Sequence, residues 1–211
     1  MKADDRPLVI CCTGPMTNTA IAYLEEPEIA GHMCVVGNDV PTDGWEFNLG
    51  NDCHATNILM DSNVEWYLNN FHSDLTYKAT LTSLYQELKN CGAVGKYLWD
   101  RTVFANEQLA VRIAEDIRLG FVGQGLNEVE LKGCVPNGEL FELNDIGAVA
   151  RVLSMGYSHI EMVDARHLVW MVNGLDHDYV PVRQLKSFTN PTDVTAFMKD
   201  FYDKLQYYYG E

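Results

Sequence analysis

Basic residues are scarce in this sequence. Lys and Arg together number 15 against 30 Asp and Glu, which gives a formal net charge of −15 at pH 7. Nucleic-acid binding depends on clustered cations that meet the phosphates, and the basic residues here form no patch along the chain. Anionic lipid would also repel a negative surface. We therefore expect no nucleic acid and no membrane among the partners.

Long apolar runs are also absent. The longest candidate, Leu8–Cys12, is far too short to cross a bilayer. The N-terminal stretch Met1–Pro7 is polar and lacks the apolar centre of a secretion signal. These two features predict a cytoplasmic protein.

No pair of cysteines has the CxxC spacing of a zinc or redox site. In a cytoplasmic protein, such cysteines are expected to be reduced and to pack as small hydrophobic residues. The six are Cys11, Cys12, Cys34, Cys53, Cys91 and Cys134.

Apolar residues make up 47% of the 211 positions, which is typical of a globular protein with a substantial core. The chain contains no internal repeat and no low-complexity linker. We predict a single domain over residues 1–211.

Apolar strands alternate with helical patterns in the first seventy residues. Strands are predicted at Leu8–Cys12, Met33–Val36 and Val64–Leu68. Thr17 or Asn18 can cap the first intervening helix, which should stop before Pro27; Asp52 can cap the second, which should end near Asp61–Asn63. This alternation predicts an α/β fold with an open, mostly parallel sheet and flanking helices.

Helical spacing continues in the second half. Two or three helices are expected from Leu81 to Gly120, broken around Gly92 and Gly95, and a terminal helix from about Val194 to Tyr208. Another helix should begin near Asp145, with an apolar face of Ile146, Val149, Val152 and Leu153. Two strands are expected at Ile160–Val163 and Leu168–Val172, and the cluster Asp176-His177-Asp178 beside Pro181 is interpreted as a turn.

The stretch from Val35 to Ala55 contains a polar loop centred on Gly44-Trp45-Glu46-Phe47-Asn48. It follows a buried strand, and ligands of open parallel sheets bind at the carboxyl ends of strands. If the segment is extended, the period of two places Glu46 and Asn48 on the same side. A solvated turn rich in Asn, Asp and Gly would have the same composition.

Several of these motifs together resemble a known family. The order and approximate spacing of the motifs are similar to those of nucleoside hydrolases of the inosine/uridine-preferring type, from about residue 6 to about residue 155. The motifs are Gly14-Pro15-Met16-Thr17-Asn18, Gly37-Asn38, Glu46-Phe47-Asn48, Asp52 with Ala55, Leu75-Thr76 and Leu143-Asn144-Asp145-Ile146-Gly147.

The resemblance implies an open α/β fold that hydrolyses the N-glycosidic bond of ribonucleosides with a bound calcium ion. It implies that Asp145 is a calcium ligand and that Thr17 supplies its backbone carbonyl to the same ion. It also implies that Asn48 binds the ribose hydroxyls and that Glu46 and Asn38 hold the 5′-hydroxyl. Asn144 stands where many members have a histidine near the leaving base, and an amide cannot donate a proton as a general acid.

The chain departs from the family in one large respect. The family's opening loop, Asp-x-Asp-x-x-x-Asp-Asp, is absent, so we expect a nucleoside-hydrolase-like fold that lacks the family's N-terminal third. One acid and one carbonyl cannot form the six- to eight-oxygen shell of calcium, so the chain alone should be a poor hydrolase.

Three interpretations follow from the absent loop. The chain is the C-terminal part of a longer enzyme, or a subunit completed by a partner chain that carries the aspartate loop; the expected partners are such a chain or, in a homo-oligomer, further copies of this one. The alternative is a catalytically inactive protein that binds a nucleoside or ribose, or a structural subunit of an assembly. The sequence does not identify the base or sugar preference.

Overall fold

The computed structural model describes residues 6–37, 47–69, 78–118, 140–143, 145–154, 159–171, 174–189 and 193–210. The chain divides into two compact units. Unit 1 combines Met1–Leu75 with Asp145–Thr192, and unit 2 combines Thr76–Asn144 with Asp193–Glu211. The single domain expected over residues 1–211 stays a prediction.

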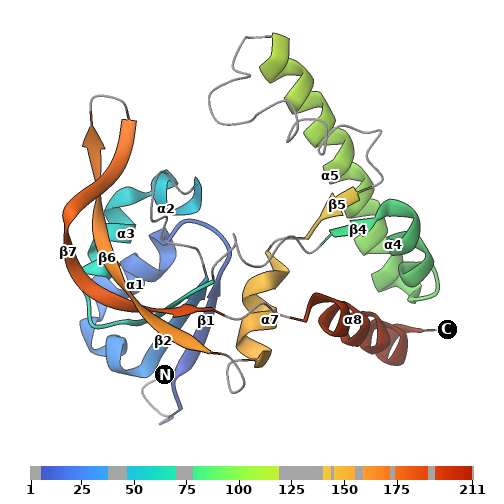
Figure 1. The fold of residues 1–211 in the computed structure, drawn as a ribbon. Helices are drawn as coiled ribbons and strands as arrows, with labels where there is room; N and C mark the ends of the chain where they lie inside the picture. Colours follow the sequence, from blue (N-terminus) through green and yellow to red (C-terminus); the bar gives the residue numbers. More distant parts are fainter. Residues whose placement is uncertain are drawn as a thin grey trace. The chain divides into compact units, whose positions relative to one another are not determined.

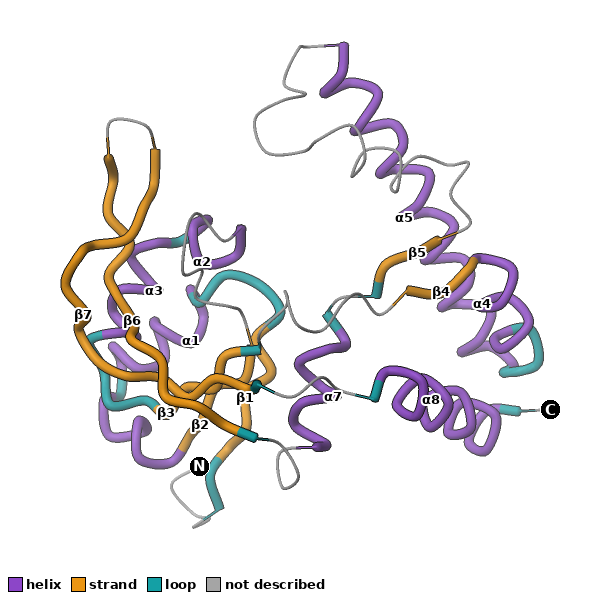
Figure 2. Tube along the Cα trace, viewed as in Figure 1, coloured by secondary structure: helices purple, strands orange, loops and turns teal. Residues whose placement is uncertain are grey.

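Unit 1 is built around a five-stranded sheet, which Figure 1 and Figure 2 show with its flanking helices. The strand order is β1-β2-β3-β7-β6. Neighbouring strands are parallel from β1 to β7, and β6 pairs antiparallel with β7. The open, mostly parallel sheet predicted from the sequence is confirmed. The strands are Leu8–Cys12 (β1), Met33–Gly37 (β2), Glu65–Leu68 (β3), Ile160–Met171 (β6) and Gly174–Phe188 (β7).

Helices connect the parallel strands of unit 1, as the alternating pattern predicted. The first helix, α1, ends at Glu25, before Pro27, which opens a 3₁₀ helix. The Asp52 side chain caps α3, as expected. The elements are α1 (Thr17–Glu25), η1 (Pro27–His32), α2 (Phe47–Asn51), α3 (Cys53–Met60) and α7 (Ile146–Ser154).

All five residues of strand β2 are buried. Successive side chains of a strand point to opposite sides, so both faces of β2 are covered. Val35 belongs to the main core, which also contains Leu59 of α3. Cys34 and Val36 belong to a smaller core on the other face, against which Val152 of α7 packs. Helices α1 and α3 therefore cover one face of the sheet, and α7 covers the opposite face at β1 and β2.

The face that α7 turns toward the sheet differs from the predicted one. Val149 and Leu153 are 43% and 62% exposed, whereas Ala148, Ala150 and Arg151 are buried. The buried part of α7 thus combines two alanines with an arginine, and Val152 packs against the smaller core. The prediction that Val149 and Leu153 lie on the buried face was therefore wrong.

Strands β6 and β7 are longer than the sequence pattern indicated. One strand, β6, runs through Ile160–Met171, where two short strands were predicted. The cluster Asp176-His177-Asp178 lies within β7, so its interpretation as a turn was wrong. Leu168 pairs with His177, and register shifts near Arg166 accommodate Pro181 in the antiparallel pair. Pairing with a partner strand overrides the local turn preference of these residues.

Unit 2 contains three helices and a short antiparallel pair among its described residues. The predicted helix break near Gly92 is confirmed, but Gly95 lies inside α5. A Cβ atom at Gly95 would lie 2.0 Å from the Leu88 carbonyl oxygen, so glycine is needed where α4 and α5 meet. The elements are β4 (Lys78–Thr80), α4 (Leu81–Leu88), α5 (Gly92–Arg118), β5 (Leu140–Glu142) and α8 (Val194–Tyr209).

The predicted terminal helix is confirmed as α8. Leu205 of α8 packs with Leu84, Leu88 and Cys91 in the core of unit 2. Asp193 caps this helix by accepting a hydrogen bond from the Ala196 amide at 2.9 Å.

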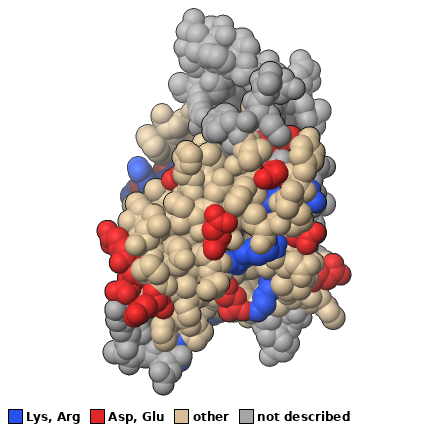
Figure 3. Space-filling model, turned by 90° about the vertical axis from the view of Figure 1, so that its left-hand side faces the viewer, with Lys and Arg blue, Asp and Glu red and all other residues tan. Residues whose placement is uncertain are grey.

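Charged side chains are mixed on the face of the molecule that Figure 3 shows. Basic side chains lie among acidic ones there and form no broad positive area. None of the helices in the described part of the chain is long and apolar enough to cross a membrane.

Candidate functional site

The carboxyl ends of β1 and β2 lie side by side, where Cys12 pairs with Gly37. Gly37 has a positive φ of 148°, and a Cβ atom there would lie 1.9 Å from the Cys12 carbonyl oxygen. Only glycine permits so close a backbone approach. Helix α1 follows β1, and the segment with α2 and α3 follows β2, so both connections leave from the edge where open α/β sheets bind ligands.

A hydrogen bond joins the starts of these two connections. The Thr17 hydroxyl donates to Oδ2 of Asp52 at 2.6 Å. Oδ1 of Asp52 accepts from the Ala55 amide at 3.0 Å and caps α3. These bonds stabilise the charged carboxylate, and the one from Thr17 contributes most to lowering the pKa of Asp52 below its ordinary value.

The prediction that Thr17 or Asn18 caps α1 was wrong. The N-cap position is Met16, with no side-chain cap bond, and Thr17 is the first helical residue. The Thr17 hydroxyl, which could have served as a cap, donates to Asp52 instead. The carbonyl of a first helical residue points along the helix axis toward the following turn. The role of this carbonyl as a calcium ligand stays a prediction.

Asn48 lies on the short helix α2, and its side chain is half-buried. The extended backbone on which Glu46 and Asn48 would share a side is not formed from Phe47 onward. The buried Thr56 hydroxyl donates to the Leu49 carbonyl at 3.0 Å and attaches α2 to α3. Asn48 is therefore carried by a helical turn that α3 holds.

Asp145 directly precedes α7, the helix that covers the face of the sheet opposite α1. Desolvation raises the pKa of its carboxyl group above the ordinary value, although the residue keeps contact with solvent. Three other candidate residues, Asn38, Glu46 and Asn144, lie outside the described residues.

The side chains of the described residues do not form a complete calcium site. Calcium requires six to eight oxygen ligands. Within the described ranges, no group of three or more His, Cys, Asp or Glu residues could hold a metal ion. The structure brings Thr17 and Asp52 together, and the assignment of Asp145 and Thr17 to one ion stays a prediction.

Sequence reasoning missed a buried arginine at the carboxyl ends of β3 and β7. Arg151 of α7 is fully buried, and its Nε donates to Oδ1 of Asn69 at 3.1 Å. Its guanidinium also lies 5.1 Å from the ring centre of Phe188. An arginine in a helical pattern is normally assigned to the solvent side. Its burial could have been predicted only if the buried face of the helix had been assigned to Ala148 and Ala150.

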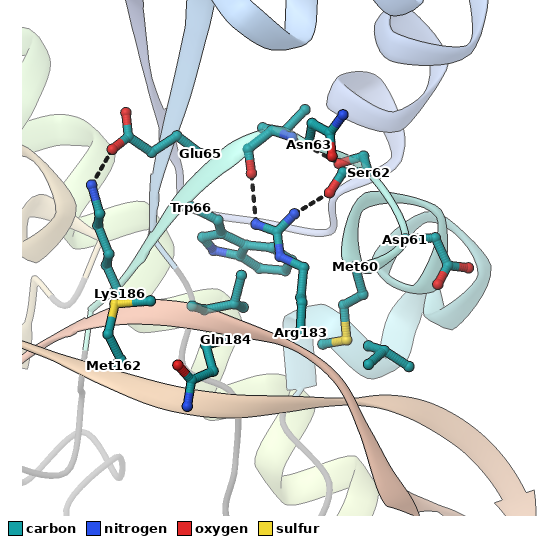
Figure 4. A pocket seen from close by; sticks show the side chains of 13 residues that line it. Met60, Asp61, Ser62, Asn63, Glu65, Trp66, Met162, Arg183, Gln184 and Lys186 are labelled. Atoms are coloured by element: carbon teal, nitrogen blue, oxygen red, sulfur yellow. Dashed lines mark hydrogen bonds and ion pairs between the residues drawn. The ribbon is translucent and has the colours of Figure 1, made fainter.

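A cavity of about 610 Å³ lies near the amino end of β3, away from the carboxyl edge. Figure 4 shows Arg183 reaching from β7 to the start of β3. Its guanidinium donates to the carbonyl oxygens of Ser62 and Val64, the latter at 2.6 Å. The side chain thus satisfies carbonyls where β3 and β7 are not paired, since their register begins at Tyr67 and Lys186. We interpret this cavity as structural.

One wall of this cavity carries an ion pair between Glu65 and Lys186. Tyr67 donates to Glu65 at 2.9 Å and accepts from Lys186 at 2.9 Å. The bond from Lys186 is the main cause that lowers the pKa of Glu65 below its ordinary value in the folded chain. Folding therefore favours the ionised carboxylate.

The Glu65 ion pair should make stability depend on pH at the acid end. Because the folded pKa is the lower one, its contribution is present above the unfolded pKa and is lost as pH falls through the folded value. We expect the free energy of unfolding to fall less between about pH 5 and about pH 3 in Glu65→Gln than in the wild type. Urea titrations at a series of pH values measure this. Identical slopes for both proteins would contradict the assignment.

No protein-family model matches the chain, and no curated protein matches it in sequence. Solved structures do match the chain, and two of them are nucleoside hydrolases. The purine-preferring ribonucleoside hydrolase from Gardnerella vaginalis is 20% identical with a TM-score of 0.55, and the match covers 92% of this chain and 58% of that one. The inosine-uridine preferring nucleoside hydrolase from Bacillus anthracis is 17% identical with a TM-score of 0.49, over 96% and 61%. The chain spans less than two thirds of either enzyme.

Proposed function

We propose that this chain, which has the fold of part of a nucleoside hydrolase, binds the ribose of a ribonucleoside at the carboxyl edge of β1 and β2. The fold match to the purine-preferring ribonucleoside hydrolase, over 92% of this chain, is the observation that carries the proposal. The expected α/β fold class is confirmed by the same match. Hydrolysis of the N-glycosidic bond is the reaction in which the chain would take part.

The geometry around Thr17 and Asn48 supports a sugar site at this edge. Both residues follow the carboxyl ends of neighbouring parallel strands, where a ligand can meet both connections. An asparagine amide can donate to one hydroxyl and accept from another, which suits a vicinal diol. In this proposal Asn48 binds the ribose hydroxyls, and Asn38 and Glu46 hold the 5′-hydroxyl.

Calcium belongs to the proposal as a cofactor whose ligands come only in part from this chain. When bound, such an ion would supply an activated water and orient the sugar. Asp145 and the Thr17 carbonyl are the proposed contributions of this chain, and the remaining ligands would come from a longer chain or from a partner subunit. Asn144 cannot act as a proton donor to the leaving base, so protonation of the base would need another group. A cytoplasmic location completes the proposal.

Titrating inosine or uridine into the chain tests the proposed sugar site. We expect binding by the wild-type chain and a loss of about tenfold in affinity for Asn48→Ala, the upper range for one hydrogen bond. Isothermal titration calorimetry, with and without calcium chloride, gives the dissociation constants. Asn63→Ala is the matched control, because Asn63 is exposed before the amino end of β3. If the chain binds neither inosine nor uridine, the proposal is wrong.

Release of free base distinguishes the hydrolase from its alternative. The chain alone is expected to show little or no turnover of inosine in the presence of calcium, and turnover should appear when a chain with the aspartate loop is added. Chromatography of the free base measures this. Nucleoside binding without base release in any of these mixtures would favour the catalytically inactive binding protein or structural subunit.

A further inference from the structure

We propose that Asp52 is a positioning residue, which sets the spacing between Thr17 and Asn48 at the proposed ribose site. The inference rests on the proposed function and adds to it a residue that does not touch the sugar. Asp52 lies between α2 and α3, directly after the helical turn that carries Asn48. A shift of Asp52 would therefore shift Asn48 through the backbone.

Both carboxylate oxygens of Asp52 are used, and they serve different elements. Oδ1 accepts from the Ala55 amide, which is the ordinary bond of an N-cap. Oδ2 accepts from the Thr17 hydroxyl at 2.6 Å, across 35 residues of sequence. A hydrogen bond to a charged acceptor is stronger than one between neutral groups. The carboxylate thus ties the start of α1, after β1, to the start of α3, after β2.

The first turns of α3 also hold α2. Thr56 is fully buried and donates to the carbonyl of Leu49, which is itself fully buried. Asn48 directly precedes Leu49, so the chain that follows Asn48 is held twice, at the Leu49 carbonyl by Thr56 and at Asp52. The bonds of Asp52 and Thr56 link the start of α1, the start of α3 and Leu49 of α2 at the carboxyl edge.

The chain provides a matched control for the bridging bond. Asp193 accepts from the Ala196 amide at 2.9 Å and caps α8 in unit 2, in the same way that Asp52 caps α3. Replacing either aspartate with asparagine keeps one carbonyl oxygen for the cap. The new amide group at position 52, however, cannot accept the proton of the Thr17 hydroxyl and can only donate to its oxygen. Asp52→Asn therefore replaces the charge-assisted bond with a neutral one at most, and Asp193→Asn changes a cap alone.

The experiment measures inosine affinity of the full chain by calorimetry for the wild type, Asp52→Asn and Asp193→Asn. Circular dichroism at the same temperature checks that each variant is folded. We expect Asp52→Asn to bind several-fold more weakly than the wild type, because a hydrogen bond to a charged acceptor is exchanged for a neutral one at most. The dissociation constant of Asp193→Asn should stay within about twofold of the wild type, since Asp193 caps a helix of unit 2 and shares no hydrogen-bond partner with Asp52.

Variants of Thr17 test the other end of the bridge. Thr17→Ser keeps the hydroxyl and Thr17→Val removes it, so the serine variant is expected to bind inosine several-fold more tightly than the valine variant. Amide hydrogen exchange adds a readout that needs no ligand: the α2 amides of Phe47–Asn51 should exchange faster in Asp52→Asn than in Asp193→Asn.

The outcomes separate the two proposals. If the wild type binds no nucleoside, the proposed function fails and this inference fails with it. If the wild type binds and Asp52→Asn binds equally well, the positioning role of Asp52 is wrong while the proposed function stands. Equal losses of affinity in Asp52→Asn and Asp193→Asn would also overturn it, because general destabilisation would then explain both.

Discussion

Replacing Gly37 with alanine is expected to lower the free energy of unfolding by about 3 kcal/mol, from backbone strain and overpacking together. The φ angle of Gly37 is +148°, which residues with a side chain rarely adopt. The new Cβ atom would lie 1.9 Å from the Cys12 carbonyl oxygen and 2.9 Å from its carbonyl carbon. Because both contacts are with backbone of the neighbouring strand, β1 and β2 would have to separate at their carboxyl ends.

Urea unfolding of the full chain, followed by circular dichroism, measures the effect of Gly37→Ala. Gly14→Ala is the control, since a Cβ atom at Gly14 meets no atom within 4 Å and its φ lies outside the left-handed region. The control should change the free energy of unfolding by less than about 1 kcal/mol, as most surface substitutions do. Equal effects at the two glycines would contradict the close approach of β1 and β2.

Trp66→Ala is expected to have the largest effect on stability, about 3–5 kcal/mol, which is typical when a buried aromatic side chain is truncated. Trp66 of β3 is 2% exposed and belongs to the main core of unit 1. Its indole N–H also donates to the Gly37 carbonyl at 3.2 Å. The substitution would therefore leave a cavity under the sheet and remove a bond at the carboxyl end of β2.

Trp66→Phe separates these two contributions. Phenylalanine keeps much of the apolar volume and lacks the N–H group, so we expect a smaller loss than for alanine. Urea titration of both variants gives the free energies, and far-ultraviolet circular dichroism reports whether the sheet is kept. A loss below about 1 kcal/mol for Trp66→Ala would be too small for a filled core site and would contradict the packing described for β3.

The strands and helices of the first seventy residues could be predicted because their signals are local. Leu8–Cys12 is a continuous apolar run, and a strand buried on both faces needs no alternation. Pro27 excludes the helical conformation for the residue before it, and the Asp52 carboxylate can reach the Ala55 amide within one helical turn. Each of these choices depends on neighbours in sequence, so the sequence sufficed.

Longer-range features could not be predicted in the same way. The pattern around Asp176-His177-Asp178 has local turn chemistry, and its strand conformation depends on pairing with β6. The buried face of α7 depends on how the helix is placed against the sheet, which buries Ala148, Ala150 and Arg151 and leaves Val149 exposed. Neither the partner strand nor the distance of approach can be derived from local spacing.

The candidate site, too, could be predicted only in part. The motif around Thr17 and the segment from Gly37 to Asp52 could be recognised from residue types and order, because a ligand edge follows from strand-loop-helix connections. The hydrogen bond from the Thr17 hydroxyl to the Asp52 carboxylate could not be predicted from the sequence. It joins two helices that only the parallel pairing of β1 and β2 brings together.

The sequence by itself determined the α/β class, most element boundaries of the first half, the cap of α3 and the acidic character of the chain. Those properties arise from side chains acting on their own backbone or from composition. Only the tertiary structure decided that Arg151 is buried beside Asn69, that Arg183 satisfies two carbonyls of the β3 approach, and that Asp52 bridges to Thr17. Each of these contacts joins residues from 35 to 121 positions apart, and their distance in space is set by packing of the whole unit.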